Sequence, residues 1–220
     1  MPTYRHPSGK RFLFIHIPRT GGRFIETNLE LNNWELEPID YRGISHGNWA
    51  LIDDCEVAHF HKPLHEKYCD IKNIPHIVVV RDPIERFISA SLYLRRGFED
   101  DAQSLMEDNF DETLETFRKM VPESRNWYRP QVDFLTDESH IWKFEDGLGK
   151  LFGKFMSEIL GLPFKVDAFA EYTVNKDEWF YKLDKTDKLI DNVRQHYRRD
   201  YEHLYPELDS SLQEGEKTKT

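Results

Sequence analysis

The chain has 220 residues, of which 39% are hydrophobic and 14% aromatic, enough to bury one core of ordinary size. Its formal net charge of -10 excludes a general attraction to nucleic acid or anionic lipid, so any anion must be bound by a local site. No apolar run resembles a signal peptide or reaches the roughly 20 residues of a membrane span, and two cysteines make no disulfide framework. We therefore expect a soluble, cytoplasmic protein with no nucleic-acid partner.

Short apolar runs bounded by charged residues, proline or glycine predict four strands. In chain order the predicted strands are Phe12 to Ile17, Val57 to His61, His76 to Val80, and His140 to Phe144. Apolar residues at helical spacing predict helices at Gly22 to Leu31, Ile84 to Arg95, Leu148 to Leu160, and Lys185 to Leu204. The acidic segment from Phe98 to Met120 is predicted to be a helix with one packed face and one solvated face.

The strands are nearly continuous apolar runs, such as HIVVV, and helices separate them. This pattern indicates an α/β fold with a central parallel sheet that helices flank on both faces. We expect a single domain over residues 1–209. The tail at residues 210–220 has almost nothing to pack and is predicted to be disordered.

The first predicted strand leads into the segment IPRTGG. In open parallel sheets ligands bind beyond the carboxyl ends of the strands, where a helix that begins there offers unpaired N–H groups to an anion. Gly21 and Gly22 let the backbone approach a ligand, while Thr20 offers a hydroxyl and Arg19 a permanent cation. The segment indicates a phosphate-like ligand, and a tight turn without a ligand is the alternative.

The segment HIVVVRDPIERFISASLYLRRG repeats this design. A buried strand ends at Arg81, Asp82 is placed to cap the next helix, and Pro83 suits the first turn. Arg81 and Ser89 are candidates to bind a second phosphate. The alternative is an ordinary helix cap followed by a surface arginine.

The two segments together resemble the sulfotransferases that use 3′-phosphoadenosine 5′-phosphosulfate (PAPS). IPRTGG is similar to their 5′-phosphosulfate loop and RDPIERFIS to their 3′-phosphate loop, and the second run is nearest to the heparan and uronyl 2-O-sulfotransferases and their bacterial and viral relatives. Weaker similarities continue through RPQVDFL, WKFEDGLGKLF and YRRDYEHLYP, so the resemblance extends from Phe12 to Pro206. It implies a P-loop-like three-layer fold, PAPS as donor and 3′-phosphoadenosine 5′-phosphate (PAP) as product, and no metal requirement.

The resemblance also implies roles for individual residues. The 5′-phosphosulfate would contact the first loop and the 3′-phosphate the second, and a later loop would close over the nucleotide; the implied binding residues are Arg19, Thr20, Gly21, Gly22, Arg23, Phe24, Arg81, Ser89 and Lys176. Trp142 is a candidate to pack near the adenine. The chain departs from the family at two positions, because the family usually has lysine at position 19 and a small hydroxyl residue at position 23. Since a guanidinium holds its proton, Arg19 is expected to act electrostatically on the bridging and leaving oxygens.

Sulfuryl transfer needs a base for the acceptor hydroxyl, and histidine suits that task. In EVAHFHKPLHEKY, strand alternation would place His59 and His61 on one face, and the pair resembles the catalytic H-x-H of the 2-O-sulfotransferases. His61 is predicted to be the base, with His59 in support, and a carboxylate such as Glu66 is an alternative. A zinc site is a further alternative; its ligand types are present at Cys55, His59, His61, His65 and Cys69, but their spacing matches no common zinc module.

Two other functions remain open. A phosphotransferase would use ATP with Mg²⁺, although the Walker pattern G-x-x-x-x-G-K-[ST] is absent from the sequence. A non-catalytic nucleotide-binding protein of the same fold is the second. The acceptor is expected to be a carbohydrate or a small hydroxylated metabolite, and the acidic chain favours a neutral or weakly charged one.

Overall fold

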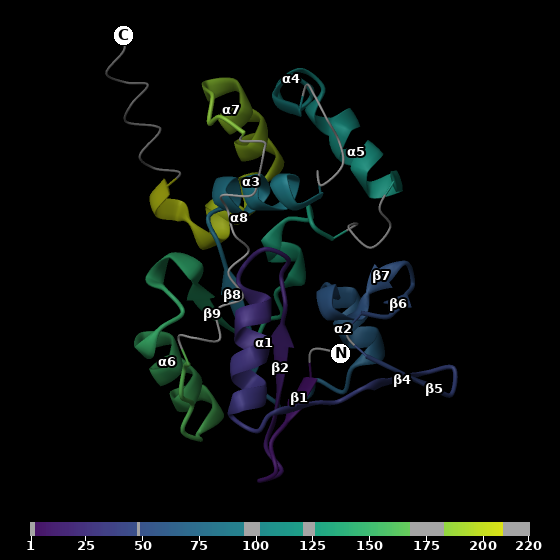
Figure 1. The fold of residues 1–220 in the computed structure, drawn as a ribbon, viewed down its shortest axis with the longest axis vertical. Helices are drawn as coiled ribbons and strands as arrows, with labels where there is room; N and C mark the ends of the chain where they lie inside the picture. Colours follow the sequence, from purple (N-terminus) through teal and green to yellow (C-terminus); the bar gives the residue numbers. More distant parts are fainter. Residues whose placement is uncertain (1–2, 48, 95–101, 121–125, 168–182, 209–220) are drawn as a thin grey trace.

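The fold is described from a computed structural model (Figure 1), in which the described residues are 3–47, 49–94, 102–120, 126–167 and 183–208. Lys176 and the predicted tail at residues 210–220 lie outside the described residues. Within the described residues, none of the helices combines the length and the apolar character needed to cross a membrane.

The central sheet has five strands in the order β3-β1-β2-β8-β9. Their bounds are Glu35–Leu36 (β3), Thr3–Arg5 (β1), Arg11–Ile15 (β2), His76–Val80 (β8) and Ser139–Lys143 (β9). Strands β2, β8 and β9 are parallel, and Ile15 lies opposite Val78. The carboxyl ends of β2 and β8 therefore lie side by side, and the two predicted anion loops leave the sheet next to each other.

Helices cover both faces of this sheet, because alternate residues of β2 and β8 point into two separate cores. Phe12, Phe14, Ile77 and Val79 pack against helices α1 (Gly22–Leu31) and α6 (Lys150–Leu160). Leu13, Ile15, Val78 and Val80 pack in the second core, with residues of α3 (Pro83–Leu94), α4 (Ala102–Asp108), α5 (Phe110–Met120), α7 (Asp187–His196) and α8 (Arg198–Leu204). The expected α/β architecture with helices on both faces is confirmed.

The expectation of a central parallel sheet is confirmed for β2, β8 and β9, but the sheet as a whole is mixed, since β1 pairs with both β2 and β3 in antiparallel fashion. Strand β1 has only three residues and joins β2 through a tight turn at His6 to Lys10, in which Gly9 has a φ of +86°. This conformation favours glycine because a side chain would clash with the backbone. A three-residue strand carries too little alternation to be recognised in the sequence.

The predicted strand from Val57 to His61 was also wrong. Val57–His59 forms the 3-10 helix η1, and His61 is the N-cap of helix α2 (Lys62–Tyr68). Both lie in a subsidiary unit with the two-stranded ribbons β4 (Ile39–Tyr41) with β5 (Ile44–His46), and β6 (Leu51–Ile52) with β7 (Cys55–Glu56). This unit has a small core of its own around Ile52, Val57 and Phe60.

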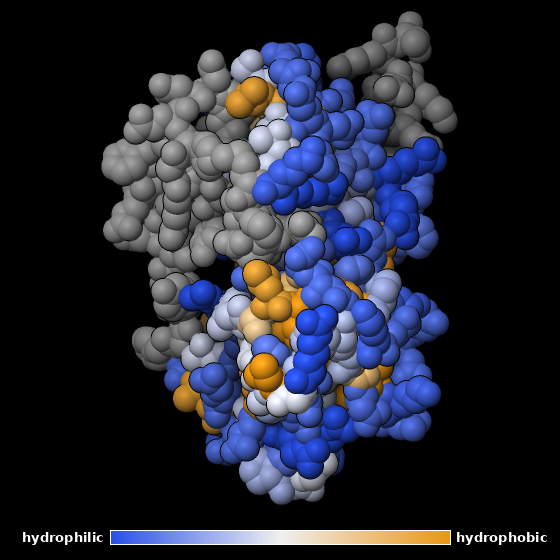
Figure 2. Space-filling model, turned by 90° about the vertical axis from the view of Figure 1, so that its right-hand side faces the viewer, coloured by the Kyte–Doolittle hydropathy of each residue, from blue (hydrophilic) through white to orange (hydrophobic). Residues whose placement is uncertain are grey.

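The helices follow the sequence patterns closely. Helix α1 has the predicted bounds, and α6 ends at Gly161, whose φ of +58° is a left-handed cap. The last predicted helix is divided into α7 and α8 at Tyr197, and the acidic segment into α4 and α5. Hydrophilic residues cover most of the described surface on the side of the subsidiary unit (Figure 2), in keeping with the highly charged composition.

Candidate functional site

The loop between β2 and α1 contains two residues in the left-handed backbone region. Arg19 has a φ of +70° and Gly21 a φ of +89°. The Thr20 hydroxyl donates a 2.9 Å hydrogen bond to the carbonyl of Ile17, which closes the loop from inside. Arg19 is therefore held in a conformation that costs a non-glycine residue on the order of 1 kcal/mol.

Gly22, the first residue of α1, leaves room for the ring of His16. An ideal Cβ on Gly22 would lie 1.7 Å from His16 Nε2, far inside any real contact. A Cβ on Gly21 would lie 2.7 Å from Leu148 Cδ1. Both glycines are thus required by the neighbours that pack against the loop, in addition to the turn itself.

The two predicted anion loops are in direct contact. Arg19 Nε donates a 3.0 Å hydrogen bond to Ser89 Oγ on α3, and Arg81 Nη1 donates a 3.2 Å hydrogen bond to the Arg19 carbonyl. Three of the predicted ligand-binding residues, from segments about 60 to 70 residues apart, therefore meet at one point. Two guanidinium groups next to the first turn of a helix form a strongly electropositive environment.

Arg81 is fixed at the end of β8 by its backbone. Its N–H donates to Gln131 Oε1 (2.9 Å), and its carbonyl accepts from Gln131 Nε2 (2.7 Å). Burial lowers the pKa of the Arg81 guanidinium, although the nearby Glu85 and Glu145 raise it. Asp82 caps α3 as predicted, since its Oδ1 accepts a 2.9 Å hydrogen bond from Glu85 N.

Arg86 contacts the first loop from the protein interior. Its side chain is fully buried, and it donates to the carbonyls of Pro18 (3.1 Å) and Trp127 (2.9 Å). Within the described residues its Nη1 has no hydrogen-bond partner. A buried guanidinium below the loop adds positive charge where an anion would bind.

His59 lies inside the site. Its Nδ1 is 3.1 Å from the His16 carbonyl and its Nε2 is 3.4 Å from Glu56 Oε2. Because a carbonyl only accepts, Nδ1 must carry the proton, and the neutral ring has its lone pair on Nε2. Burial, together with the charges of His16, Arg86 and Arg19, holds the pKa of His59 well below its usual value.

His61, the predicted base, lies apart from the contacts that His59 makes with the His16 carbonyl and with Glu56. Its ring is half-buried, and its Nδ1 has no hydrogen-bond partner among the described residues. Burial and, to a smaller extent, the positive charge of Arg129 lower the pKa of His61 to about 4, although the charge of Asp133 opposes them. The role of His61 stays a prediction, but the strand geometry that paired it with His59 is wrong.

The sequence analysis missed the pairing of His16 with Glu26. His16 Nδ1 lies 3.2 Å from Glu26 Oε1, and the His16 and His59 rings are 4.6 Å apart in an edge-to-face arrangement. Burial raises the pKa of Glu26, but the charge and hydrogen bond of His16 and the charge of Arg23 outweigh it, so the net shift is downward. A histidine at the end of an otherwise apolar strand, directly before the loop, was the available signal.

The remaining predicted residues are distributed around the site. Arg23 lies on α1 with its Cζ 5.2 Å from the Trp49 ring, and Phe24 packs against the core beneath α1. Trp142 packs on Phe152 and Phe155 and donates to the Gly147 carbonyl, so its role near adenine stays a prediction. No three His, Cys, Asp or Glu side chains in the described parts of the chain are grouped to hold a metal.

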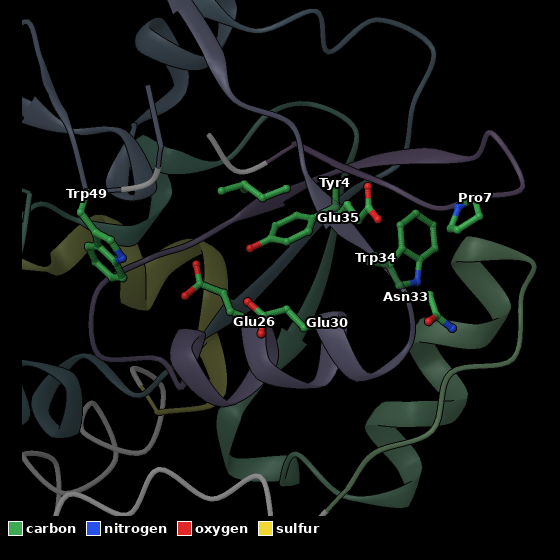
Figure 3. Close-up of a pocket in the computed structure, with 9 residues that line it drawn as sticks. Tyr4, Pro7, Glu26, Glu30, Asn33, Trp34, Glu35 and Trp49 are labelled. Carbon is green, nitrogen blue, oxygen red and sulfur yellow. The ribbon is translucent and has the colours of Figure 1, made fainter. Parts of the chain in front are cut away.

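A pocket of about 570 Å³ lies along α1 beside this site (Figure 3). Glu26 and Glu30 of α1 form one side, Tyr4 of β1 lies across from them, and Trp49 and Trp34 stand at opposite ends. The other lining residues are Pro7, Asn33, Glu35 and Leu36. Glu26 belongs both to this pocket and to the pair with His16.

Comparison of the chain with protein-family models, with curated proteins and with solved structures finds no significant match in any of the three.

Proposed function

We propose that the protein is a sulfotransferase that moves the sulfuryl group of PAPS to an acceptor hydroxyl. The observation that carries this proposal is the contact of Arg19 with both Ser89 and Arg81. It joins the two loops whose sequences resemble the 5′-phosphosulfate and 3′-phosphate loops of that family. The parallel pairing of β2 and β8 brings the loops side by side, and the hydrogen bonds of Arg19 then join them directly.

The arrangement of the loops supports binding of a nucleotide with two separate phosphate groups. The first loop offers the N-terminus of α1, the Thr20 hydroxyl and the Arg19 guanidinium, and the second offers Arg81 and Ser89. Gly21 and Gly22 let His16 and Leu148 pack against the loop, which fixes its conformation. In this proposal the three-layer fold is that of the P-loop-like sulfotransferases.

The transfer step breaks one bond and forms another. The acceptor oxygen attacks sulfur, the bond from sulfur to the bridging phosphate oxygen breaks, and the electron pair leaves with PAP. Arg19 stabilises the charge that develops on the leaving oxygens, because its guanidinium does not give up a proton.

We assign the acceptor proton to Nε2 of His59. Its Nδ1 is engaged by the His16 carbonyl, so Nε2 carries the lone pair, and Glu56 at 3.4 Å stabilises the imidazolium that forms. The His59 ring lies edge-on to the ring of Trp127, which the guanidinium of Arg19 also contacts, whereas His61 lies at the start of α2. His59 is therefore favoured over His61 as the base.

The donor is tested by calorimetric titration of the full chain with PAP and with ATP, each with and without Mg²⁺. We expect PAP to bind without metal and in preference to ATP. Replacement of Arg81 with alanine should weaken PAP binding by about 10-fold or more, because a charge-assisted hydrogen bond contributes about 1.5–3 kcal/mol. Arg198→Ala is the matched control, since Arg198 is exposed on α8 and pairs with Glu202.

The same titration separates the alternatives. Binding of ATP with Mg²⁺ and none of PAP would assign the site to a phosphotransferase. Binding of PAP with no transfer from PAPS to any acceptor would indicate a non-catalytic nucleotide-binding protein. His59→Ala and His61→Ala are compared in the transfer reaction, where a loss confined to the His61 variant would overturn the assignment of His59.

A further inference from the structure

The pocket along α1 is connected to the proposed transfer site by two contacts. Glu26 lines the pocket and its carboxylate lies 3.2 Å from His16, whose carbonyl in turn holds His59. Trp49 lines the same end of the pocket and is covered by the guanidinium of Arg23, in the first turn of α1. The end of the pocket between Glu26 and Trp49 therefore borders the site where the acceptor hydroxyl must react.

The pocket is lined with groups that suit hydroxyls and sugar rings. Glu26, Glu30 and Glu35 provide carboxylates. An ionised carboxylate can accept hydrogen bonds but cannot donate them, so it suits the O–H donors of a hydroxylated ligand. Trp49 is 53% exposed and offers a flat aromatic surface at one end, and Tyr4 crosses the middle (Figure 3). The volume of about 570 Å³ falls in the range of roughly 300–1,000 Å³ that small-molecule sites occupy.

The charge of the lining selects against anions. Three of the nine lining residues are glutamates, and none is lysine or arginine. A carboxylate or sulfate on the acceptor would face like charges from the three glutamates, and the guanidinium of Arg23 lies only at the Trp49 end of the pocket. This local reason for a neutral acceptor is independent of the net charge of the whole chain.

We propose that this pocket is the acceptor site and that it takes a neutral, hydroxylated acceptor the size of one or two sugar rings. This inference rests on the proposed sulfotransferase function and names its substrate class. Glu30 and Trp49 determine specificity in the pocket, and Glu26 positions His16 while it contacts the acceptor.

The test is direct binding of defined probes to the full chain, measured by saturation-transfer NMR. The probes are the methyl glycosides of glucose, galactose, mannose and N-acetylglucosamine, with methyl glucuronide as the anionic comparison. We expect at least one neutral glycoside to bind and methyl glucuronide to bind more weakly. Trp49→Ala and Glu30→Gln should each weaken that binding by about 10-fold, because each removes a contact of 1–2 kcal/mol or more.

Glu138→Gln is the matched control, because Glu138 is exposed and lies outside the pocket. The inference is overturned if no neutral glycoside binds, if methyl glucuronide binds as well as the neutral probes, or if both pocket variants bind them unchanged. PAP binding is titrated in the same samples to separate the two proposals. Normal PAP binding with a failed glycoside test removes only the acceptor site. Glycoside binding that depends on Trp49 without PAP binding removes the sulfotransferase and the acceptor role, and leaves the pocket as a glycoside-binding site.

Discussion

Gly22→Ala is the change that tests the geometry of the first loop most directly. The added Cβ would lie 1.7 Å from His16 Nε2, whereas ordinary contacts of a Cβ begin near 3.4 Å. The histidine ring must therefore move by nearly 2 Å, which cannot happen without loss of the 3.2 Å contact with Glu26.

The expected cost follows from these two effects. Overpacking in a filled site costs about 1–3 kcal/mol, and loss of a hydrogen bond to a charged group about 1.5–3 kcal/mol. Alanine recovers up to about 1 kcal/mol as a better helix former than glycine. The free energy of unfolding should fall by about 1.5–6 kcal/mol, and Tm by roughly 3–24 °C in a chain of this size.

Urea denaturation and calorimetry of four proteins measure this cost in a double-mutant cycle. His16→Ala removes the ring, so Gly22→Ala should cost almost nothing in that background. Gly47→Ala is the control, since a Cβ there has nothing within 4 Å. If Gly22→Ala costs the same with and without the His16 ring, the close packing of these two residues is refuted.

Three further predictions concern buried polar groups. Burial lowers the pKa of His65 to about 3 in the folded chain. As the pH falls through 6.5, His65 therefore takes up a proton in the unfolded chain but not yet in the folded chain. His65 should contribute about 2 kcal/mol to the fall in the free energy of unfolding from pH 6.5 to pH 5, in addition to the contributions of His59 and His61, whose pKa values are also lowered. In urea titrations His65→Leu, but not His140→Gln, should reduce the slope by that amount. Arg86→Met should destabilise the fold by about 3 kcal/mol or more, because the two loop carbonyls lose their donor, while exposed Arg198→Met should change stability by less than about 0.5 kcal/mol. Burial raises the pKa of Cys69 to about 12, so iodoacetamide should leave it unmodified at neutral pH until urea unfolds the chain; rapid native labelling would contradict its burial.

The sequence predicts the elements that are long and have clear ends. The strand His76–Val80 and the helix Gly22–Leu31 have the expected bounds, because one is a continuous buried run and the other follows two glycines. The antiparallel edge formed by β1 and β3 could not be predicted, since strands of three and two residues depend on pairing with neighbours distant in the chain.

The local sequence pattern also gave a wrong prediction for the segment that contains His59 and His61. Ala58 to His61 alternates apolar and polar residues as a strand does, but the segment is too short to separate a period of two from one of three. Tertiary contacts decide its conformation, because Asn126 Nδ2 donates a 2.7 Å hydrogen bond to the His59 carbonyl. The contact of Glu26 with His16 depends on packing of α1 against β2, which no local pattern encodes.

Arg19 connects the local strain of the first loop with its proposed chemistry. A non-glycine residue with a φ of +70° costs stability that glycine at this position would not. The side chain of Arg19 donates to Ser89 and its carbonyl accepts from Arg81, so both ends of the residue join the two loops. Glycine would retain the turn but lose the cation and the contact with Ser89. Lysine would retain a cation but lose the directional Nε donor, which is bonded to Ser89 at 3.0 Å. The arginine at position 19 therefore fits the proposed role, in which it holds the two loops together and stabilises charge without acting as a proton donor.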